Sequence, residues 1–334
     1  MKVEVEVQIL TYIGSKARMA GVLSRLIPPH CTIYAELYSG SAALALNSRK
    51  FAVKILNDLN PHMANFWKIA TNPETSEELL KRLQATTYSR SAFLAAKQRQ
   101  REHGANQADK LQWAVDTFIL NRQSFNSCGE SWVYDDRGAY QNMLKNPLKL
   151  PLAFKALQGQ TFRVYNDNAL EVMDKEHLLD NPDAFLFLDP PYLEGLRSHG
   201  KLYQVDMPDV RDHIDLLKKI RMAKAKIVLS GYWSGRDDGT DLYDYYLLPY
   251  GWHRHLLGEY AKGCEVGATK SMGAEWVWCN YDLKAEAPGG IGFLKSYCDE
   301  RKSPCLMEWL ALQSRPRGVK RYLEKSIRTS GGEC

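Results

Sequence analysis

Hydrophobic positions along the chain fall into short runs, separated by longer stretches in which apolar and polar residues alternate. The short runs have the length and composition of buried strands. They cover residues 32–37, 51–56, 161–165, 184–188, 226–229 and 276–280. Helical patterns lie between most of these runs, and this alternation predicts an α/β fold with a doubly wound sheet.

The pattern changes between residues 61 and 160. Polar and apolar positions recur there at helical period over residues 76–86, 91–101 and 109–120, and no run resembles a strand. We therefore predict a helical insertion between the second and third strands of the sheet.

The end of this insertion is rich in turn-forming residues. Asp136, Arg137 and Gly138 lie between two arms that carry aromatic residues, a composition that favours a tight turn between strands. Residues 125–140 are therefore predicted to form a protruding β-hairpin.

Pro288-Gly289-Gly290 interrupts the pattern again and opens a tail with a basic cluster at residues 315–321. The predicted organisation is a sheet domain of residues 1–60 and 161–287, the helical insertion with its hairpin at residues 61–160, and a basic C-terminal extension at residues 288–334.

Composition narrows the class of partner. The 334 residues carry 44 Lys and Arg against 39 Asp and Glu, and the formal charge of +5 mildly favours a polyanionic partner. The seven cysteines are scattered without a C-x-x-C pair, so we expect no metal site and interpret them as reduced thiols of a cytoplasmic protein. No signal-peptide pattern or long apolar run is present, so no membrane partner is expected.

Polar residues that directly follow the strand runs are the first candidates for a ligand site, because open α/β sheets bind ligands beyond the carboxyl ends of their strands. Glu36 ends the first run and precedes the turn Tyr38-Ser39-Gly40-Ser41, which leads into a predicted helix at residues 42–46. Such a turn lets the backbone approach a ligand closely, although small residues before a helix are as often an ordinary cap.

Two further carboxylates follow strand runs. Asp58, after the second run, is placed to accept hydrogen bonds from a ribose diol, and Asp167, after the third, to accept one from an adenine amine. The alternative for both residues is a helix N-cap.

The fourth run ends in Asp189-Pro190-Pro191-Tyr192. Consecutive prolines donate to neither a sheet nor a helix, so the chain must leave the sheet as a rigid extended turn that fixes one carboxylate and one carbonyl. A purely structural Pro-Pro exit needs neither the acid before it nor the aromatic residue after it. We therefore interpret this tetrad as functional.

These elements, in this order, resemble the Dam-like, class-alpha family of adenine-specific DNA methyltransferases, and phage and prophage members in particular. The resemblance covers about residues 10–283. The matching elements are Tyr12-Ile13-Gly14-Ser15-Lys16, Glu36-Leu37-Tyr38-Ser39-Gly40-Ser41, the insertion from about Pro61, Asn121-Arg122-Gln123-Ser124-Phe125-Asn126, the tetrad, and the late elements at residues 229–232 and 275–281.

The resemblance implies a Rossmann-like sheet that binds S-adenosylmethionine, releases S-adenosylhomocysteine and acts on double-stranded DNA recognised by the insertion. The catalytic residues that it implies are Asp189, Pro190, Pro191 and Tyr192. The cofactor contacts that it implies are Tyr12, Gly14, Lys16, Glu36, Tyr38, Ser39, Gly40, Ser41, Asp58, Asp167, Asn168 and Asp189. Lys16 and the Gly40 turn are expected near the amino-acid end of the cofactor.

The sequence departs from the family pattern at several positions. Ser15 and Ala42 stand where members often have glycine, and Asn168 stands where an aromatic residue often packs on the cofactor adenine. Glu130 stands where GATC-specific members carry a guanine-reading arginine. Because a carboxylate has no donor for the acceptor edge of guanine, GATC is not the expected target.

The implied reaction methylates the exocyclic amine of an adenine that has been flipped out of the duplex. The Asp189 carboxylate and the Pro190 carbonyl accept the two N–H bonds of the amine and turn its lone pair toward the methyl group, without a cysteine nucleophile or a metal. Tyr192 is expected to stack on the flipped base.

Target reading is assigned to Arg122, Phe125, Asn126, Tyr134 and Arg137. Asn126 suits the edge of an adenine, and Phe125 suits a wedge in the vacated base stack. For each of these residues the alternative is a hairpin brace or a solvated surface position.

Two other functions stay open from the sequence. The same tetrad serves amino-methyltransferases that act on cytosine N4 or on RNA, and a DNA-binding protein with weak or no catalysis would keep the same fold. A nucleotide hydrolase is disfavoured, because Gly14-Ser15-Lys16 lacks the longer glycine-rich loop that cradles phosphates.

Overall fold

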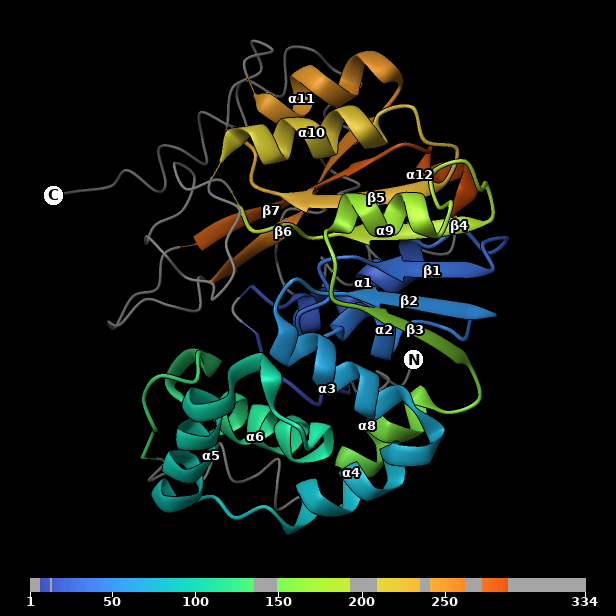
Figure 1. Cartoon of the computed structure of the whole chain (residues 1–334). Coiled ribbons are helices and arrows are strands. Elements are labelled where there is room, and N and C mark those ends of the chain that lie inside the picture. Colours follow the sequence, from blue (N-terminus) through green and yellow to red (C-terminus); the bar gives the residue numbers. More distant parts are fainter. Residues whose placement is uncertain are drawn as a thin grey trace, which may run out of the picture.

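The computed structural model describes residues 7–12, 14–134, 149–192, 209–234, 241–261 and 272–287. Its centre is a seven-stranded sheet with the strand order β3-β2-β1-β4-β5-β7-β6 (Figure 1). The strands are β1 (Ile33–Glu36), β2 (Val53–Asn57), β3 (Thr161–Tyr165), β4 (Ala184–Leu188), β5 (Lys226–Gly231), β6 (His253–Ala261) and β7 (Met272–Cys279). Strands β1 to β5 are parallel, and β7 lies antiparallel between β5 and β6. The predicted doubly wound α/β sheet is confirmed, and its order reverses between β1 and β4, where such sheets bind ligands.

The predicted strand runs match β1 to β5 and β7, but β6 was not predicted. Arg254 of β6 is buried through its ion pair with Asp244, so a buried position of the strand carries a charge. In addition, β6 lies at the edge of the sheet, where β7 is its only strand neighbour among the described residues. Both features hide the apolar pattern that marks the central strands.

Successive residues of the central strands pack on opposite faces of the sheet. On β4, Phe185 and Phe187 belong to one apolar cluster, whereas Leu186 and Leu188 belong to the other. The second cluster is covered by α9 (Ala169–Lys175), α10 (Val210–Ile220) and α11 (Leu242–Leu247) (Figure 1).

The first cluster is covered by the N-terminal part of the chain and by the insertion. The N-terminal elements are η1 (Lys16–Met19), α1 (Ala20–Leu23), η2 (Ser24–Leu26) and α2 (Ala43–Asn47). The insertion contains α3 (Pro61–Thr71), α4 (Pro73–Ala85), α5 (Arg90–His103), η3 (Gly104–Asn106), α6 (Lys110–Gln123), η4 (Phe125–Ser127) and α8 (Lys149–Leu157). The short elements η6 (Leu248–Tyr250) and α12 (Leu283–Glu286) complete the described secondary structure.

The insertion helices begin where local sequence chemistry favours a start. In α3 and α4 an Asn-Pro pair supplies both the capping side chain, Asn60 or Asn72, and a proline at the first helical position. The side chains of Ser89 and Asp109 cap α5 and α6 respectively. Helices α4, α5 and α6 overlap the stretches for which the periodicity predicted helices.

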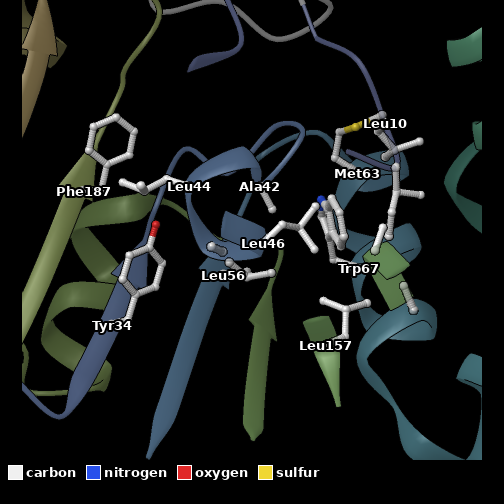
Figure 2. Close-up of a cluster of buried hydrophobic side chains, with 14 of the residues drawn as sticks. Leu10, Tyr34, Ala42, Leu44, Leu46, Leu56, Met63, Trp67, Leu157 and Phe187 are labelled. Carbon is white, nitrogen blue, oxygen red and sulfur yellow. The ribbon is translucent and has the colours of Figure 1, made fainter. Parts of the chain in front are cut away.

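The described part of the insertion shares its hydrophobic core with the sheet. A single cluster of buried side chains runs from Tyr34 and Phe187 on the sheet, through Leu46 of α2, to Trp67 of α3 and Phe118 of α6. Figure 2 shows the part of this cluster that contains Tyr34, Phe187, Leu46 and Trp67. Because the apolar contacts are continuous, we expect the sheet and the insertion to unfold together rather than as two domains.

The predicted hairpin falls only partly on described residues. Ser124 and Trp132 form an antiparallel bridge, and Val133 donates a backbone hydrogen bond of 3.1 Å to the Gln123 carbonyl. The intervening loop turns through Ser127 and Gly129, both of which have positive φ. The predicted turn at Asp136, Arg137 and Gly138 lies outside the described residues, as does the predicted basic extension.

None of the helices in the described ranges combines the length and apolar composition needed to cross a bilayer.

Candidate active site

A cavity of about 290 Å³ lies at the carboxyl ends of the parallel strands. All the residues that the sequence assigned to the cofactor line this cavity: Tyr12, Gly14, Lys16, Glu36, Tyr38, Ser39, Gly40, Ser41, Asp58, Asp167, Asn168 and Asp189. Pro191 of the tetrad lines it as well, whereas Pro190 and Tyr192 are buried. The structure therefore brings residues from four separate strand ends to one site, and their contact with a cofactor stays a prediction.

The turn after β1 brings the backbone against the ring of Tyr12. Gly40 has a φ of +44°, and a Cβ at this position would meet the Tyr12 ring at 3.2 Å, so both conformation and space require glycine. Trp67 of α3 donates its indole N–H to the Gly40 carbonyl at 2.8 Å, which fixes the turn from the side of the insertion. The hydroxyls of Ser15 and Ser41, 2.8 Å apart, join the turn to the N-terminal element.

Helix α2 is held by side chains from the two strands beside it. Glu36 accepts hydrogen bonds from the Ala45 backbone N–H at 2.9 Å and from the Tyr34 hydroxyl at 2.7 Å, while Lys54 donates to the Ala45 carbonyl at 2.5 Å. Burial raises the pKa of Glu36 to about 8 and lowers the pKa of Lys54 to about 7. The N-cap residue, Ala42, makes no side-chain capping bond, so the interpretation of this turn as an ordinary cap is wrong.

Asp58 links the turns after β1 and β2. Its carboxylate accepts hydrogen bonds from the backbone N–H groups of Gly40 at 2.6 Å and Asn60 at 2.9 Å. Burial raises the pKa of Asp58 to about 6, although both hydrogen bonds act in the opposite direction. The cap of α3 is Asn60, so Asp58 is not the helix cap and its carboxylate lines the cavity.

The same division of roles occurs after β3. Asn168 caps α9 by accepting a hydrogen bond from the Leu170 N–H at 2.8 Å, and Asp167 lines the cavity with its side chain 43% exposed. Asn57, at the end of β2, fixes this turn by accepting from the Asp167 N–H at 3.1 Å and donating to the Leu37 carbonyl at 3.0 Å. The sequence analysis missed Asn57, because an asparagine after a strand indicates no more than a turn.

Asp189 lies directly after β4, and Lys16 reaches it from the N-terminal element. The Lys16 ammonium is 2.9 Å from each oxygen of the Asp189 carboxylate, and it also donates to the Gly14 carbonyl at 3.1 Å. The side chain of Lys16 is only 4% exposed and that of Asp189 is 19% exposed. The lysine that was expected near the amino-acid end of the cofactor is thus paired with the predicted catalytic acid.

The hydroxyl of Tyr192 joins this ion pair to two further polar side chains. It lies 2.7 Å from the Lys16 ammonium, 3.1 Å from Asp189, and 3.0 Å from both the Ser230 hydroxyl and the Glu275 carboxylate. The ring is 7% exposed and packs on Tyr232 with a centroid distance of 4.4 Å. Because the ring is covered in this arrangement, its stacking on a base stays a prediction.

Glu275 of β7 is part of the same cluster, and the sequence analysis gave it no role. Its carboxylate lies 3.8 Å from the Lys16 ammonium. Burial raises the pKa of Glu275, and the positive charge of Lys16 acts against this rise. One feature of the sequence could have indicated a role for Glu275: it directly precedes the buried Trp276. An acidic residue at such a position needs a partner, because acidic residues are seldom buried without one.

Two aspartates of α10, Asp212 and Asp215, also line the cavity and were missed, because aspartates on an amphipathic helix normally belong to its solvated face. With them, the described lining contains one lysine against one glutamate, Glu36, and five aspartates. The aspartates are Asp58, Asp167, Asp189, Asp212 and Asp215. This excess of negative charge attracts a cationic ligand and repels a phosphate-bearing one. The charge of the described lining therefore favours a ligand with positive groups over a nucleotide.

Of the predicted target-reading residues, those that the structure describes lie at the C-terminal end of α6 and in the segment that follows it. Phe125 is 48% exposed and Tyr134 is 77% exposed, and both are thus accessible to a large ligand. Arg122 is partly buried at the end of α6. Arg137 and the side chain of Asn126 lie outside the described residues.

Asn121, the first residue of the matched Asn-Arg signature, ties the insertion to the N-terminal element. Its side chain accepts a hydrogen bond from the Thr11 N–H at 2.8 Å and donates one to the Thr11 carbonyl at 2.6 Å. Thr11 directly precedes Tyr12, which packs on the Gly40 turn. The end of α6 is thereby connected to the cavity through two residues.

A second, open groove lies between α5 and the loop after η4. Its lining includes Arg90, Lys97 and Arg101 of α5 together with Glu130 and Trp132 of the loop. Lys97 and Glu130 form an ion pair at 2.9 Å, so Glu130 is engaged by a cation of the neighbouring helix. The groove is net positive, in contrast to the acidic cavity at the strand ends.

The fold and the site together define a Rossmann-like methyltransferase. A family model of the D12 class N6 adenine-specific DNA methyltransferases matches residues 12–254, well over half of the chain. The chain therefore belongs to the D12 class N6 adenine-specific DNA methyltransferases, enzymes that methylate adenine N6 in DNA with S-adenosylmethionine. The predicted Dam-like adenine methyltransferase family is confirmed. No curated protein matches the chain.

No group of three or more His, Cys, Asp or Glu side chains in the described ranges is arranged to hold a metal ion.

Proposed function

We propose that this protein methylates N6 of an adenine that is flipped out of double-stranded DNA, and that Asp189 is the residue that captures the target amine. The observation that carries the proposal is the place of Asp189. It lies at the end of the central strand β4, its carboxylate faces the cavity, and both carboxylate oxygens already bind a nitrogen cation, the Lys16 ammonium. Because this carboxylate already accepts hydrogen bonds from the N–H groups of Lys16, it is also suited to accept them from the exocyclic amine of a base.

The cofactor site of the proposal is the acidic cavity. Asp58 is proposed to accept hydrogen bonds from the ribose hydroxyls, because an ionised carboxylate that binds two backbone N–H groups still has acceptor sites to spare. Asp167 is proposed to accept from the adenine amine of the cofactor, and the Gly40 turn to lie against its amino-acid part. S-adenosylmethionine supplies the electrophilic methyl group and leaves as S-adenosylhomocysteine.

The target amine is a weak nucleophile, because its lone pair is delocalised into the purine ring. In the proposed mechanism the Asp189 carboxylate and the Pro190 carbonyl accept its two N–H bonds and so hold the lone pair out of conjugation. The carboxylate also stabilises the positive charge that develops on the nitrogen during transfer. The rigid Pro190-Pro191 exit keeps both acceptors in place without a sheet or helix bond.

Tyr192 is proposed to provide the stacking face for the flipped base, a contact worth about 1–3 kcal/mol for an aromatic side chain. Its hydroxyl bonds to Lys16, Ser230 and Glu275 fix the orientation of the ring. Since the ring is 7% exposed, this role requires the ring to become uncovered when DNA binds.

DNA binding is proposed to involve the insertion. Arg90, Lys97 and Arg101 line the positive groove beside α5, which suits the phosphate backbone. Arg122, Phe125, Asn126, Tyr134 and Arg137 are the proposed target-reading residues. The exposed rings of Phe125 and Tyr134 support this assignment, because a wedge or stacking residue must be accessible.

The test of the proposed function has two steps. The protein is expressed in a host without adenine methylation, and host DNA is then sequenced for N6-methyladenine, which reports activity and target together. Asp189→Asn, which keeps the shape of the side chain, is then compared with the wild type and with Asp180→Asn, whose side chain is 92% exposed.

We expect Asp189→Asn to lower the rate of methyl transfer by about 100-fold to 1000-fold while DNA binding is retained, and Asp180→Asn to behave as wild type. Transfer by Asp189→Asn at the wild-type rate would refute the assignment of Asp189. A wild-type protein that leaves host adenine unmodified, and also fails to methylate duplex DNA in vitro, would refute the function.

A further inference from the structure

The Lys16 ammonium occupies the acceptor site that the target amine needs. It is 2.9 Å from both oxygens of Asp189, and its side chain is 4% exposed. Under the proposed function, an adenine amine and the Lys16 ammonium compete for the same carboxylate. The base is therefore captured only if the lysine gives up at least one of these hydrogen bonds.

A buried ammonium that leaves its carboxylate needs a second partner close by, because an isolated charge in the interior is costly. Glu275 is in position to be this partner. Its carboxylate is 3.8 Å from the Lys16 ammonium, which is within ion-pair distance but beyond the length of a direct hydrogen bond. A small rotation of the lysine side chain is enough to close this gap.

The sheet places Glu275 at this point. Strand β7 is inserted between β5 and β6, and its register pairs Trp276 with Gly231, so the preceding residue, Glu275, lies beyond the carboxyl end of β5. From there its carboxylate comes within 3.8 Å of the Lys16 ammonium and 3.0 Å of the Tyr192 hydroxyl. Glu275 also lies outside residues 12–254, over which the family model matches.

The phenol of Tyr192 lies between the two acids. It is 3.1 Å from the Asp189 carboxylate and 3.0 Å from the Glu275 carboxylate, and the Lys16 ammonium is 2.7 Å away. One cation is thus shared by two carboxylates that face each other across a hydroxyl. With Asp189 and Glu275 both ionised, the cluster carries one negative charge more than Lys16 neutralises.

We propose that Glu275 is a positioning residue that takes the Lys16 ammonium from Asp189 when the target amine arrives. The exchange breaks and forms only hydrogen bonds: the lysine N–H groups move from the Asp189 oxygens to the Glu275 carboxylate, and an N–H group of the target amine takes their place on Asp189. Lys16 keeps its charge, and Asp189 keeps a donor throughout. This inference rests on the proposed function, since it concerns how the same carboxylate is freed.

The test variant is Glu275→Gln, which keeps the size of the side chain and its acceptor for the Tyr192 hydroxyl but removes the charge. The matched control is Glu286→Gln, because Glu286 of α12 also pairs with a partly buried lysine, Lys226 of β5, at 2.7 Å. Single-turnover methyl transfer measures the chemical step. A duplex with 2-aminopurine next to the target adenine, which keeps its N6 amine, reports base capture by the fluorescence change when the adenine leaves the stack, including in variants that do not turn over.

We expect Glu275→Gln to reduce base capture and single-turnover methyl transfer by about 10-fold or more, while the affinity for S-adenosylmethionine changes little. Glu286→Gln should match the wild type in both assays. In a Lys16→Met background, which has no ammonium to move, Glu275→Gln should have little further effect on base capture.

A purely structural role for Glu275, as a support for Tyr192, makes a different prediction. The loss would then persist in the Lys16→Met background and would disappear in a Tyr192→Phe background, which has no hydroxyl for Glu275 to hold. That result would overturn the proposal, and so would wild-type base capture by a folded Glu275→Gln protein. Either result leaves the proposed function intact, because the wild type still methylates adenine.

Discussion

The cavity at the strand ends and helix α4 of the insertion satisfy their charges in different ways. In the cavity, Lys16 bonds to Asp189 and lies 3.8 Å from Glu275, so residues far apart in the chain share one cluster. On the outer helices of the insertion, the ion pairs of α4 join residues four positions apart, Lys81 with Glu77 and Arg82 with Glu78.

This difference separates the consequences of substitution in the two regions. Exposed pairs four positions apart on a helix contribute only about 0.3–0.5 kcal/mol each. Removal of one partner from a buried pair costs about 3–5 kcal/mol, because the other charge is left without compensation. We therefore expect cavity variants to change cofactor binding and chemistry, and surface variants of the insertion to change DNA binding alone.

The largest effect outside the tetrad is expected from Asp58→Asn in the cavity. The variant loses the negative charge and one acceptor toward the ribose, so the affinity for S-adenosylmethionine should fall by about 10-fold to 100-fold. Isothermal titration calorimetry measures this change, with Asp180→Asn as the exposed control. An unchanged affinity would show that the Asp58 carboxylate does not contact the cofactor.

The raised pKa of Asp58 adds a pH dependence to the same comparison. Because burial raises this pKa to about 6, the carboxylate is ionised above that pH and becomes neutral as the pH falls through it. Wild-type affinity for S-adenosylmethionine should therefore be full at pH 8 and weaken below pH ~6. In Asp58→Asn this part of the pH dependence should be absent. If affinity depended on pH in the variant as it does in the wild type, the assignment of Asp58 to cofactor binding would be contradicted.

Asn121→Ala tests the connection between the two regions. The variant removes all three hydrogen bonds between Asn121 and Thr11, so the free energy of unfolding should fall by about 1–3 kcal/mol in denaturant titrations. Affinities for both DNA and S-adenosylmethionine should weaken together, because Thr11 precedes Tyr12 at the Gly40 turn. Asn106→Ala, at an exposed position of η3, is the control. A loss confined to DNA binding would show that the two regions are not coupled through this contact.

The paired substitution of Arg90 and Arg101 by glutamine tests the insertion surface. Each phosphate contact contributes about −0.9 to the slope of log affinity against log salt concentration, so the slope should become shallower by about 2. Cofactor affinity should be unchanged. Lys81→Gln, which removes a cation that already pairs with Glu77 on α4, is the matched control. An unaltered salt slope would exclude this groove from the DNA interface.

The smallest effect is expected from Ala42→Gly in the turn after β1. Ala42 has a φ of +46°, which costs an L-residue about 1–2 kcal/mol, but glycine loses the buried methyl group and increases the entropy of the unfolded chain. These contributions nearly cancel, so the free energy of unfolding, measured by thermal unfolding, should change by less than about 1 kcal/mol. Gly40→Ala is the contrasting variant. It should lower the free energy of unfolding more than Ala42→Gly does, because its methyl group would meet the Tyr12 ring at 3.2 Å.

Features that depend on residues close together in the chain could be predicted from the amino-acid sequence. Apolar runs predicted the strands β1 to β5 and β7, helical period predicted α4 to α6, and the residues after each strand run predicted the lining of the cavity. The position of the cavity is predictable because parallel strands bring their carboxyl ends to one edge of the sheet. The Asp-Pro-Pro-Tyr tetrad and the other matching elements, in their order along the chain, were sufficient to indicate the family that the family model confirms.

The ion pairs and charged clusters between residues far apart in the chain could not be predicted in this way. The pairing of Lys16 with Asp189, the approach of Glu275 from β7 and the addition of Asp212 from α10 depend on which elements become neighbours. The tertiary structure also shows that one apolar cluster contains side chains of both the insertion and the sheet. Local pattern fixes the conformation of each segment, but contacts such as Tyr192 with Glu275, 83 positions apart, and Lys16 with Asp189, 173 positions apart, follow from the order of strands in the sheet.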